Sequence, residues 1–265
     1  MQTPSTTEKL PPFSFRRLAW HLGFILLFAV IMAWAWRKSE INPWALMSNA
    51  QNSAIYLKDF IRPDFSHWRQ YVDSMMVTLA MALWGSLLAV IAAVPLGLMA
   101  ASNISPFWLR QIVRRFLDAL RSINEMIFAI AFMVAVGLGP FAGMLALFVH
   151  TAGVLGKLFS EVVESIDPKP VEGIRAVGAN RLQEIIFGVI PQVLPMWISY
   201  SLYRFESNVR SATVVGIVGA GGIGYELYEL FRTYEFGQVS CMLIIILVTV
   251  SIIDIASAQI RKVTV

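Results

Sequence analysis

Long apolar runs alternate with short charged segments along most of this 265-residue chain. The runs at 18–36 and 75–101 contain no Asp, Glu, Lys or Arg, and neither does the stretch 126–156. A helix needs about 20 apolar residues to cross the hydrocarbon core of a bilayer. The pattern therefore predicts an all-α, polytopic membrane protein.

The stretch 126–156 is interrupted by the sequence Gly-Leu-Gly-Pro at 137–140, which predicts a turn between two helices. The stretch is too short for two spans of about 20 residues each. We therefore expect the first helix to begin near Phe116, and the second to continue past Lys157 towards Ile166.

Apolar runs at 185–203 and 236–253 bring the expected number of transmembrane helices to about six. Within the core we expect a cytoplasmic polar loop at 167–190 and an external Gly-rich loop at 216–238. The expected segments are a cytoplasmic N-terminal tail at 1–17, a first transmembrane helix at 18–36, an external polar segment at 37–70 and the core at 71–260.

Composition supports the membrane assignment, because 57% of the residues are hydrophobic and only 14% are charged, whereas soluble domains contain about 25% charged residues. Six spans place both termini on one side. Thirteen of the 21 basic residues then lie on that side, and cytoplasmic loops are the ones enriched in Lys and Arg. We therefore expect cytoplasmic termini, and we attribute the net charge of +4 to this bias and not to nucleic-acid binding.

The polar segment at 167–190 has the signals of two short helices. Asp167-Pro168 is a typical helix start, and Gly178-Ala179-Asn180 predicts a tight turn between the pieces. Periodicity alone allows either an amphipathic connector at the membrane surface or a docking element. Apolar residues recur at helical spacing on both sides of the turn: Val171, Ile174, Val177, Leu182, Ile185 and Ile186.

Three positions in this segment carry a more specific pattern. Glu172 is followed six residues later by Gly178, and a terminal Ile190-Pro191 pair comes about a dozen residues further on. This spacing resembles the coupling loop of permease subunits in binding-protein-dependent ABC importers. The two alanines that follow the Glu in that motif are Gly173 and Ile174 here, which leaves the docking of the first helical turn open.

The resemblance covers about residues 60–260. The stretches 65–76, 165–180 and 191–224 are similar to the permeases of bacterial phosphonate importers. It implies a multi-pass protein of the bacterial inner membrane with an ABC importer permease fold, embedded in lipid. The residues that it implies for ATPase coupling are Glu172, Ala176, Gly178, Ala179 and Pro191.

The same resemblance implies the partners. Two ABC ATPase subunits dock on 172–186 from the cytoplasm, a periplasmic binding protein delivers phosphonate, and a second copy of the chain completes the pathway. ATP and Mg are expected on the ATPase, because the sequence has no G-x-x-x-x-G-K-[ST] motif. The chain itself is expected to be no enzyme and to carry no cofactor.

A glycine cluster at 219–224 matches G-x-G-x-x-G, the dinucleotide-binding fingerprint. We reject that interpretation because the motif needs a βαβ unit and an acid about 20 residues later, where this chain is apolar. A tightly turning loop is the simpler interpretation, and the resemblance implies a gate on the external side. The residues concerned are Gly219, Gly221, Gly222, Ile223 and Gly224.

Charged residues also interrupt the fifth span. Glu206 and Arg210 are four residues apart and can pair on one helix face, whereas Arg204 faces elsewhere. We expect Arg204 or Arg210 to supply positive potential along a pathway for an anion. Arg121 and Glu125 have the same spacing and are interpreted as a structural pair.

The sequence leaves two other functional classes as alternatives. A secondary transporter of an anionic solute would show internal repeats and broken helices, and Pro191 with Pro195 could form such a break, although no matching half is evident. A membrane enzyme would need a catalytic constellation, and none is visible. His21 and His150 are interpreted as buried imidazoles and not metal ligands, and Cys241 as a small buried apolar residue.

Overall fold

The computed structural model describes residues 15–40, 42, 44 and 58–264. The chain divides into two units, Met1–Ile55 and Tyr56–Val265, and each is described by itself. Most of the expected tail at 1–17 and a large part of the expected polar segment at 37–70 lie outside the described residues. In the first unit, α1 (Phe15–Lys38) is a single helix with basic residues in its last turn.

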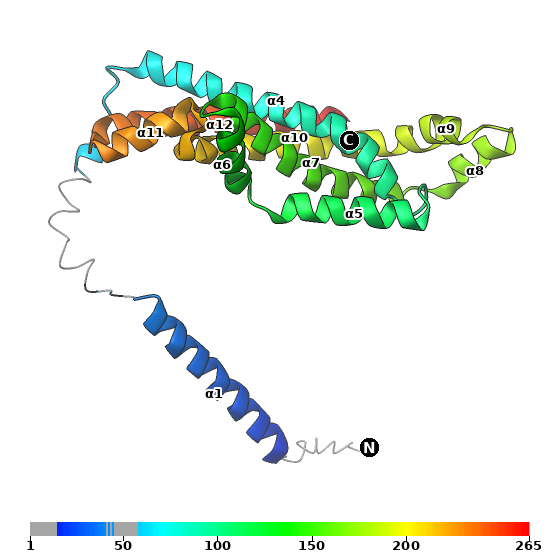
Figure 1. Ribbon diagram of the computed structural model, residues 1–265, viewed down its shortest axis with the longest axis horizontal. Helices are drawn as coiled ribbons and strands as arrows, with labels where there is room; N and C mark the ends of the chain where they lie inside the picture. The colour runs from blue at the N-terminus through cyan, green and yellow to red at the C-terminus, as the bar shows by residue number, and fades with distance from the viewer. Residues whose placement is uncertain (1–14, 41, 43, 45–57, 265) are drawn as a thin grey trace, which may run out of the picture. The chain divides into compact units, whose positions relative to one another are not determined.

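Every regular element in the described part of the second unit is helical. In this unit, α8 and α9 lie at one end and α11 lies at the opposite end (Figure 1). The elements in chain order are α4 (Trp68–Ala100), α5 (Phe107–Ser122), α6 (Glu125–Val136), α7 (Pro140–Glu164), α8 (Pro168–Ala176), α9 (Arg181–Gln183), the π-helical turn η1 (Glu184–Val189), α10 (Ile190–Val215), the π-helical turn η2 (Gly216–Ala220), α11 (Gly222–Arg232) and α12 (Phe236–Thr264).

Among the described residues, five helices are long and apolar enough to cross a membrane: α1, α4, α7, the continuous stretch Arg181–Ala220, and α12. The pair α5 and α6 makes a sixth span if the two are counted together. This confirms the all-α fold with about six spans. α7 continues past Lys157, as predicted.

The helix expected to begin near Phe116 is not continuous. α5 ends at Ser122, and α6 leaves it at 90°. Ile123 is extended, and the Asn124 side chain caps α6 by accepting a hydrogen bond from the Met126 N–H at 2.9 Å. An N-cap satisfies amides that have no partner in the preceding turn, so it begins a separate helix. The prediction of one helix across this region is therefore wrong.

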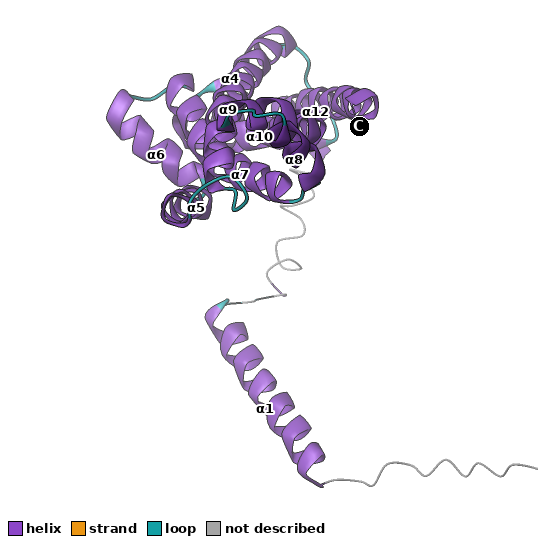
Figure 2. Cartoon of the chain, turned by 90° about the vertical axis from the view of Figure 1, so that its right-hand side faces the viewer, coloured by secondary structure: helices purple, strands orange, loops and turns teal. Residues whose placement is uncertain are grey.

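Small residues let α4 and α7 pack closely. A Cβ at Gly97 would lie 2.7 Å from the Phe159 Cβ, and one at Gly85 would lie 3.0 Å from the Leu147 Cβ. Lipid tails are as apolar as leucine, so close packing and not the hydrophobic effect holds such helices together. In the end-on view, α10 lies in the middle of the unit among α4, α7 and α12 (Figure 2).

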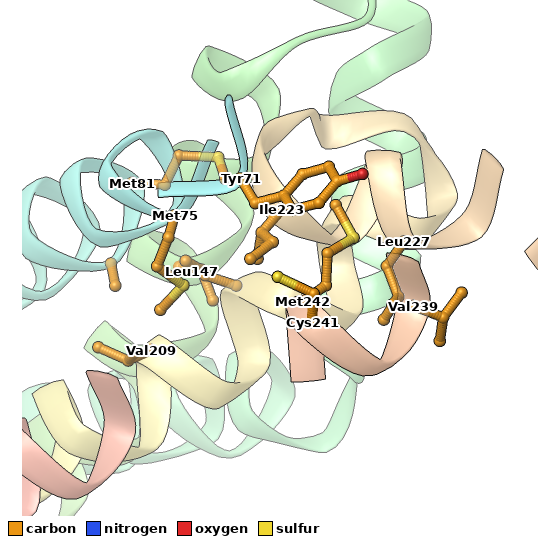
Figure 3. Packing of buried hydrophobic residues seen from close by; sticks show 12 residues of the cluster. Tyr71, Met75, Met81, Leu147, Val209, Ile223, Leu227, Val239, Cys241 and Met242 are labelled. Atoms are coloured by element: carbon orange, nitrogen blue, oxygen red, sulfur yellow. The ribbon is translucent and has the colours of Figure 1, made fainter. Parts of the chain in front are cut away.

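The end of the unit that carries α11 has a core of its own. Tyr71 and Met75 of α4 meet Ile223 of α11 and Met242 of α12, and all four are buried (Figure 3). Cys241 belongs to the same cluster and is a buried free thiol, as predicted. This core fixes α11 against the two longest helices of the second unit.

Candidate functional site

The polar segment after α7 folds as two short helices joined by a turn, as predicted. Asp167 caps α8 by accepting a hydrogen bond from the Lys169 N–H at 3.0 Å. Gly178 has a φ of +87° in the turn, a conformation that favours glycine. Asn180 and Gln183 then form a reciprocal capping box at the start of α9. We call residues 167–190 the hairpin.

Two arginines close the hairpin around Glu184. Arg175 donates from Nε to Glu184 Oε1 at 2.8 Å and from Nη2 to Glu184 Oε2 at 3.0 Å. The Arg181 Nη1 lies 3.4 Å from the Glu184 Oε2. Arg181 also donates a hydrogen bond from Nη2 to the carbonyl oxygen of Ile104, in the connection between α4 and α5. The hydrogen bond and the charge of Glu184 raise the pKa of Arg175 above its ordinary value. The arginines thus connect α8, α9 and the body of the unit.

The sequence interpretation missed this clamp. Glu184 is 6% exposed and is the only buried Asp, Glu, Lys or Arg among the residues with described side chains. The sequence signal that could have indicated the pair is the presence of opposite charges, Arg175 and Glu184, on either side of the predicted turn. Their pairing depends on the angle at which the turn closes, and residue spacing does not specify that angle.

The other residues predicted for coupling lie along the hairpin. Glu172 is exposed on α8 and lines a pocket of about 330 Å³ whose wall includes Glu184. Ala176 is exposed at the end of α8, and Ala179 is partly buried in the turn. Pro191 lies in the first turn of α10, directly after the π-helical turn η1.

The apolar residues of the hairpin divide between two faces. A Cβ at Gly188 would lie 3.2 Å from the Val171 Cγ2 and 3.3 Å from the Ile174 Cδ1, so these two side chains pack inside the hairpin. Val177 and Leu182 point outward and are 84% and 64% exposed. A large exposed apolar patch can mark a site of protein interaction, and these two side chains contribute apolar surface on either side of the hairpin turn. The hairpin therefore has an anchored inner face and an exposed apolar tip.

A second tight turn lies at the opposite end of the unit, where η2 meets α11. The Thr78 Oγ1 of α4 accepts a hydrogen bond from the Ile223 N–H at 2.9 Å. A Cβ at Gly222 would lie 2.3 Å from that oxygen, and one at Gly224 would lie 1.9 Å from the Thr213 carbonyl oxygen. These glycines are required by packing, and Thr78 is a contact that the sequence interpretation did not identify.

The remaining glycines of this turn face the turn between α6 and α7. Gly219 and Gly221 have φ values of +112° and +79°. A Cβ at Gly219 would lie 3.0 Å from the Leu138 Cδ2, and one at Gly221 would lie 3.4 Å from Pro140. Two glycine turns that are far apart in the sequence thus pack against each other.

Much of the segment expected as a Gly-rich loop at 216–238 is helical. Residues 222–232 form α11, which buries Ile223, Gly224 and Leu227 and exposes Tyr225 and Tyr228. The apolar residues recur every three to four positions, and this spacing gives a helix one buried face. The irregular parts are the turn around Gly219 and Gly221 and the short connection at 233–235 between α11 and α12.

The charges of α10 separate into two groups. Arg210 and Glu206 pair at 3.1 Å, as predicted. On α12, the Asp254 Oδ1 lies 3.4 Å from the Arg210 Nη1, and the Arg261 Nη1 lies 3.6 Å from the Glu206 Oε2. These ion pairs connect α10 to α12. Arg204 is partly buried and is attracted to a carboxylate on α6 instead.

Glu125, at the start of α6, is that carboxylate. It accepts a hydrogen bond from the Ser211 Oγ at 2.7 Å, and the His150 Nε2 lies 3.7 Å away. The expected pair between Arg121 and Glu125 is not formed, because Arg121 pairs with Asp118 at 3.0 Å. The 90° bend between α5 and α6 explains this result, since the two residues do not share one helix.

Comparison with protein families gives a match over residues 93–263 to the family described as "Binding-protein-dependent transport system inner membrane component". The matched region contains the hairpin, both glycine turns and the charges of α10. It excludes α1 and most of α4.

The proteins similar to the chain include two curated transport permeases and one solved structure. The phosphite transport system permease protein PtxC of Stutzerimonas stutzeri is 37% identical over 89% of this chain and 86% of its own length. The putative cryptic phosphonate transport system permease protein PhnE2 of Escherichia coli K12 is 65% identical over 45% of this chain and 98% of its own length. An inward-facing structure of the MetNI methionine ABC transporter has a chain with a TM-score of 0.66 and 23% identity, covering 74% of this chain and 96% of that one. The last likeness supports the fold.

Proposed function

Because the chain belongs to the family of binding-protein-dependent transport system inner membrane components, we propose that it forms the pathway through which an ATP-driven importer moves a phosphonate, phosphite or related phosphorus oxyanion into the cytoplasm. The chain is a multi-pass inner-membrane permease and not an enzyme. The observation that carries the substrate class is the similarity to a phosphite permease over most of both chains. The similarity to a phosphonate permease agrees with it.

The hairpin is proposed as the site of ATPase coupling. Its tip exposes Val177 and Leu182, which offer an apolar contact to a protein partner. Its base is bound to the body of the permease through the Arg175–Glu184 clamp and through Arg181. A rigid element that is exposed at one end and anchored at the other can transmit a displacement of its partner to the helices that it joins.

We also propose the side of the membrane and the partners. The hairpin end faces the cytoplasm, both termini are cytoplasmic, and the α11 end faces the periplasm. Two ATPase subunits carry ATP and Mg, a second copy of this chain completes the pathway, and a periplasmic binding protein delivers the anion. At the α11 end, the two packed glycine turns gate the outer mouth of the pathway.

Uptake by the reconstituted complex tests the proposal. Liposomes containing the permease and its ATPase, supplied with the binding protein, are expected to accumulate methylphosphonate or phosphite only when ATP is hydrolysed. An ATPase variant unable to hydrolyse ATP is expected to abolish uptake. Accumulation that continues with this variant and follows an ion gradient would identify a secondary transporter and overturn the proposal.

A further inference from the structure

Arg204 and Arg210 lie six residues apart on α10 but have different electrostatic surroundings. Arg210 pairs with Glu206 at 3.1 Å and with Asp254 at 3.4 Å. Arg261 also approaches Glu206, at 3.6 Å. The charge of Arg210 is therefore offset by carboxylates of α10 and α12, and Arg210 connects these two helices.

Arg204 has no comparable ion pair. In the described part of the chain it forms no ion pair, and its buried Nε has no hydrogen-bond partner. Glu125 attracts it, but that carboxylate is held by the Ser211 hydroxyl and lies beside His150. An arginine within a membrane span is costly unless it is paired or faces a polar cavity.

The unpaired guanidinium of Arg204 suits an anion with several oxygens. Its planar donors match phosphorus oxyanions and can donate two parallel hydrogen bonds. Resting on the transport function proposed above, we propose that Arg204 is the side chain that contacts the phosphorus oxyanion during translocation. Arg210 instead belongs to the structural link between α10 and α12.

Glu125 has a second role in this arrangement. Conduction requires that an ion bind strongly enough to enter a site and weakly enough to leave it. A carboxylate near Arg204 competes with the bound anion for the guanidinium and repels the anion itself. The Ser211 hydroxyl holds Glu125 by a hydrogen bond of 2.7 Å, and the His150 Nε2 lies 3.7 Å from the other carboxylate oxygen.

The test uses the complete complex in liposomes, with methylphosphonate and phosphite as the transported anions. Arg204→Gln is expected to raise the KM for uptake roughly 10- to 100-fold, as expected for the loss of a hydrogen bond to a charged group. Arg204→Lys keeps the charge but loses the planar pair of N–H donors. The KM of this variant is therefore expected to lie between those of the wild type and Arg204→Gln. The matched control is Arg210→Gln, which leaves the ion pair between Glu206 and Arg261 in place. The KM of this variant is expected to stay near the wild-type value.

A double variant separates anion contact from a purely structural role. If Arg204 served only to offset Glu125, Arg204→Gln/Glu125→Gln would restore uptake, and this result would overturn the proposal. We expect the double variant to remain impaired. A loss of assembled complex or of ATPase activity in Arg204→Gln without a change in KM would indicate a lipid or packing contact, and would also overturn it.

The outcomes distinguish this inference from the proposed function. Wild-type complex that transports neither methylphosphonate nor phosphite contradicts the proposed function. Wild-type complex that transports them while Arg204→Gln retains the wild-type KM contradicts only the role of Arg204.

Discussion

Arg175 and Glu184 are joined by two parallel hydrogen bonds of 2.8 Å and 3.0 Å, which bridge α8 and the π-helical turn that leads into α10. The carboxylate is buried, whereas the guanidinium is more than half exposed. The pair thus connects the exposed part of the hairpin to the beginning of a membrane-spanning helix.

Breaking this pair is expected to uncouple ATP hydrolysis from transport. Arg175→Gln leaves Glu184 with Arg181 alone, at 3.4 Å, so α8 is expected to lose its fixed angle to α10. Uptake per ATP hydrolysed is expected to fall several-fold while the amount of assembled permease stays unchanged. The charge exchange Arg175→Glu/Glu184→Arg is expected to recover part of the loss. Lys169→Gln on the same helix, which alters an exposed side chain, is the control.

Two glycines of the hairpin are expected to respond in opposite directions to alanine. Gly173 lies inside α8, and a Cβ added there would have nothing within 4 Å, so Gly173→Ala is expected to stabilise the helix by about 1 kcal/mol. Gly178 has equal space but a φ of +87°, so Gly178→Ala is expected to cost about 1–2 kcal/mol. Thermal unfolding midpoints of the purified permease check both signs. A lower midpoint for Gly173→Ala would contradict the helical assignment of this position.

Thr78 is expected to hold the glycine turn at the α11 end. Thr78→Val has a similar shape but removes the acceptor for the buried Ile223 N–H, and we expect a cost of about 1–3 kcal/mol. Thr78→Ser keeps the hydroxyl and is expected to lose much less stability. Thermal unfolding of the purified wild type and both variants tests this order of stability. Equal midpoints for the valine and serine variants would show that the hydrogen bond does not contribute.

Asn208 is expected to hold three helices together. Its side chain donates to the Ser86 Oγ of α4 at 2.8 Å and accepts from the Thr151 Oγ1 of α7 at 3.0 Å. Asn208→Leu removes both contacts, and hydrogen bonds between membrane helices contribute about 1–2 kcal/mol. Ser201→Ala, which removes only a bond to the Trp197 carbonyl oxygen within α10, is the matched control and is expected to have a smaller effect. The resistance of each variant to unfolding in detergent measures the difference.

Local features of the hairpin were predictable from neighbouring residues. The cap formed by Asp167 and the turn at Gly178 depend on interactions over a few residues, and both are found where the sequence indicates them. The pair formed by Glu206 and Arg210 follows from the spacing of one helical turn. The same rule failed for Arg121 and Glu125, because the cap at Asn124 begins a new helix between them.

The sequence by itself determined the membrane-embedded, all-α character of this protein, because the length of an apolar run and the placement of Lys and Arg are properties of the linear chain. Only the tertiary structure decided which polar groups meet. Glu184 with Arg175, Thr78 with Ile223, and the separation of Arg204 from the pair formed by Arg210 and Glu206 all depend on how helices cross and bend. The crossing of α4 and α7 depends in turn on small residues that pack against one another from distant parts of the chain.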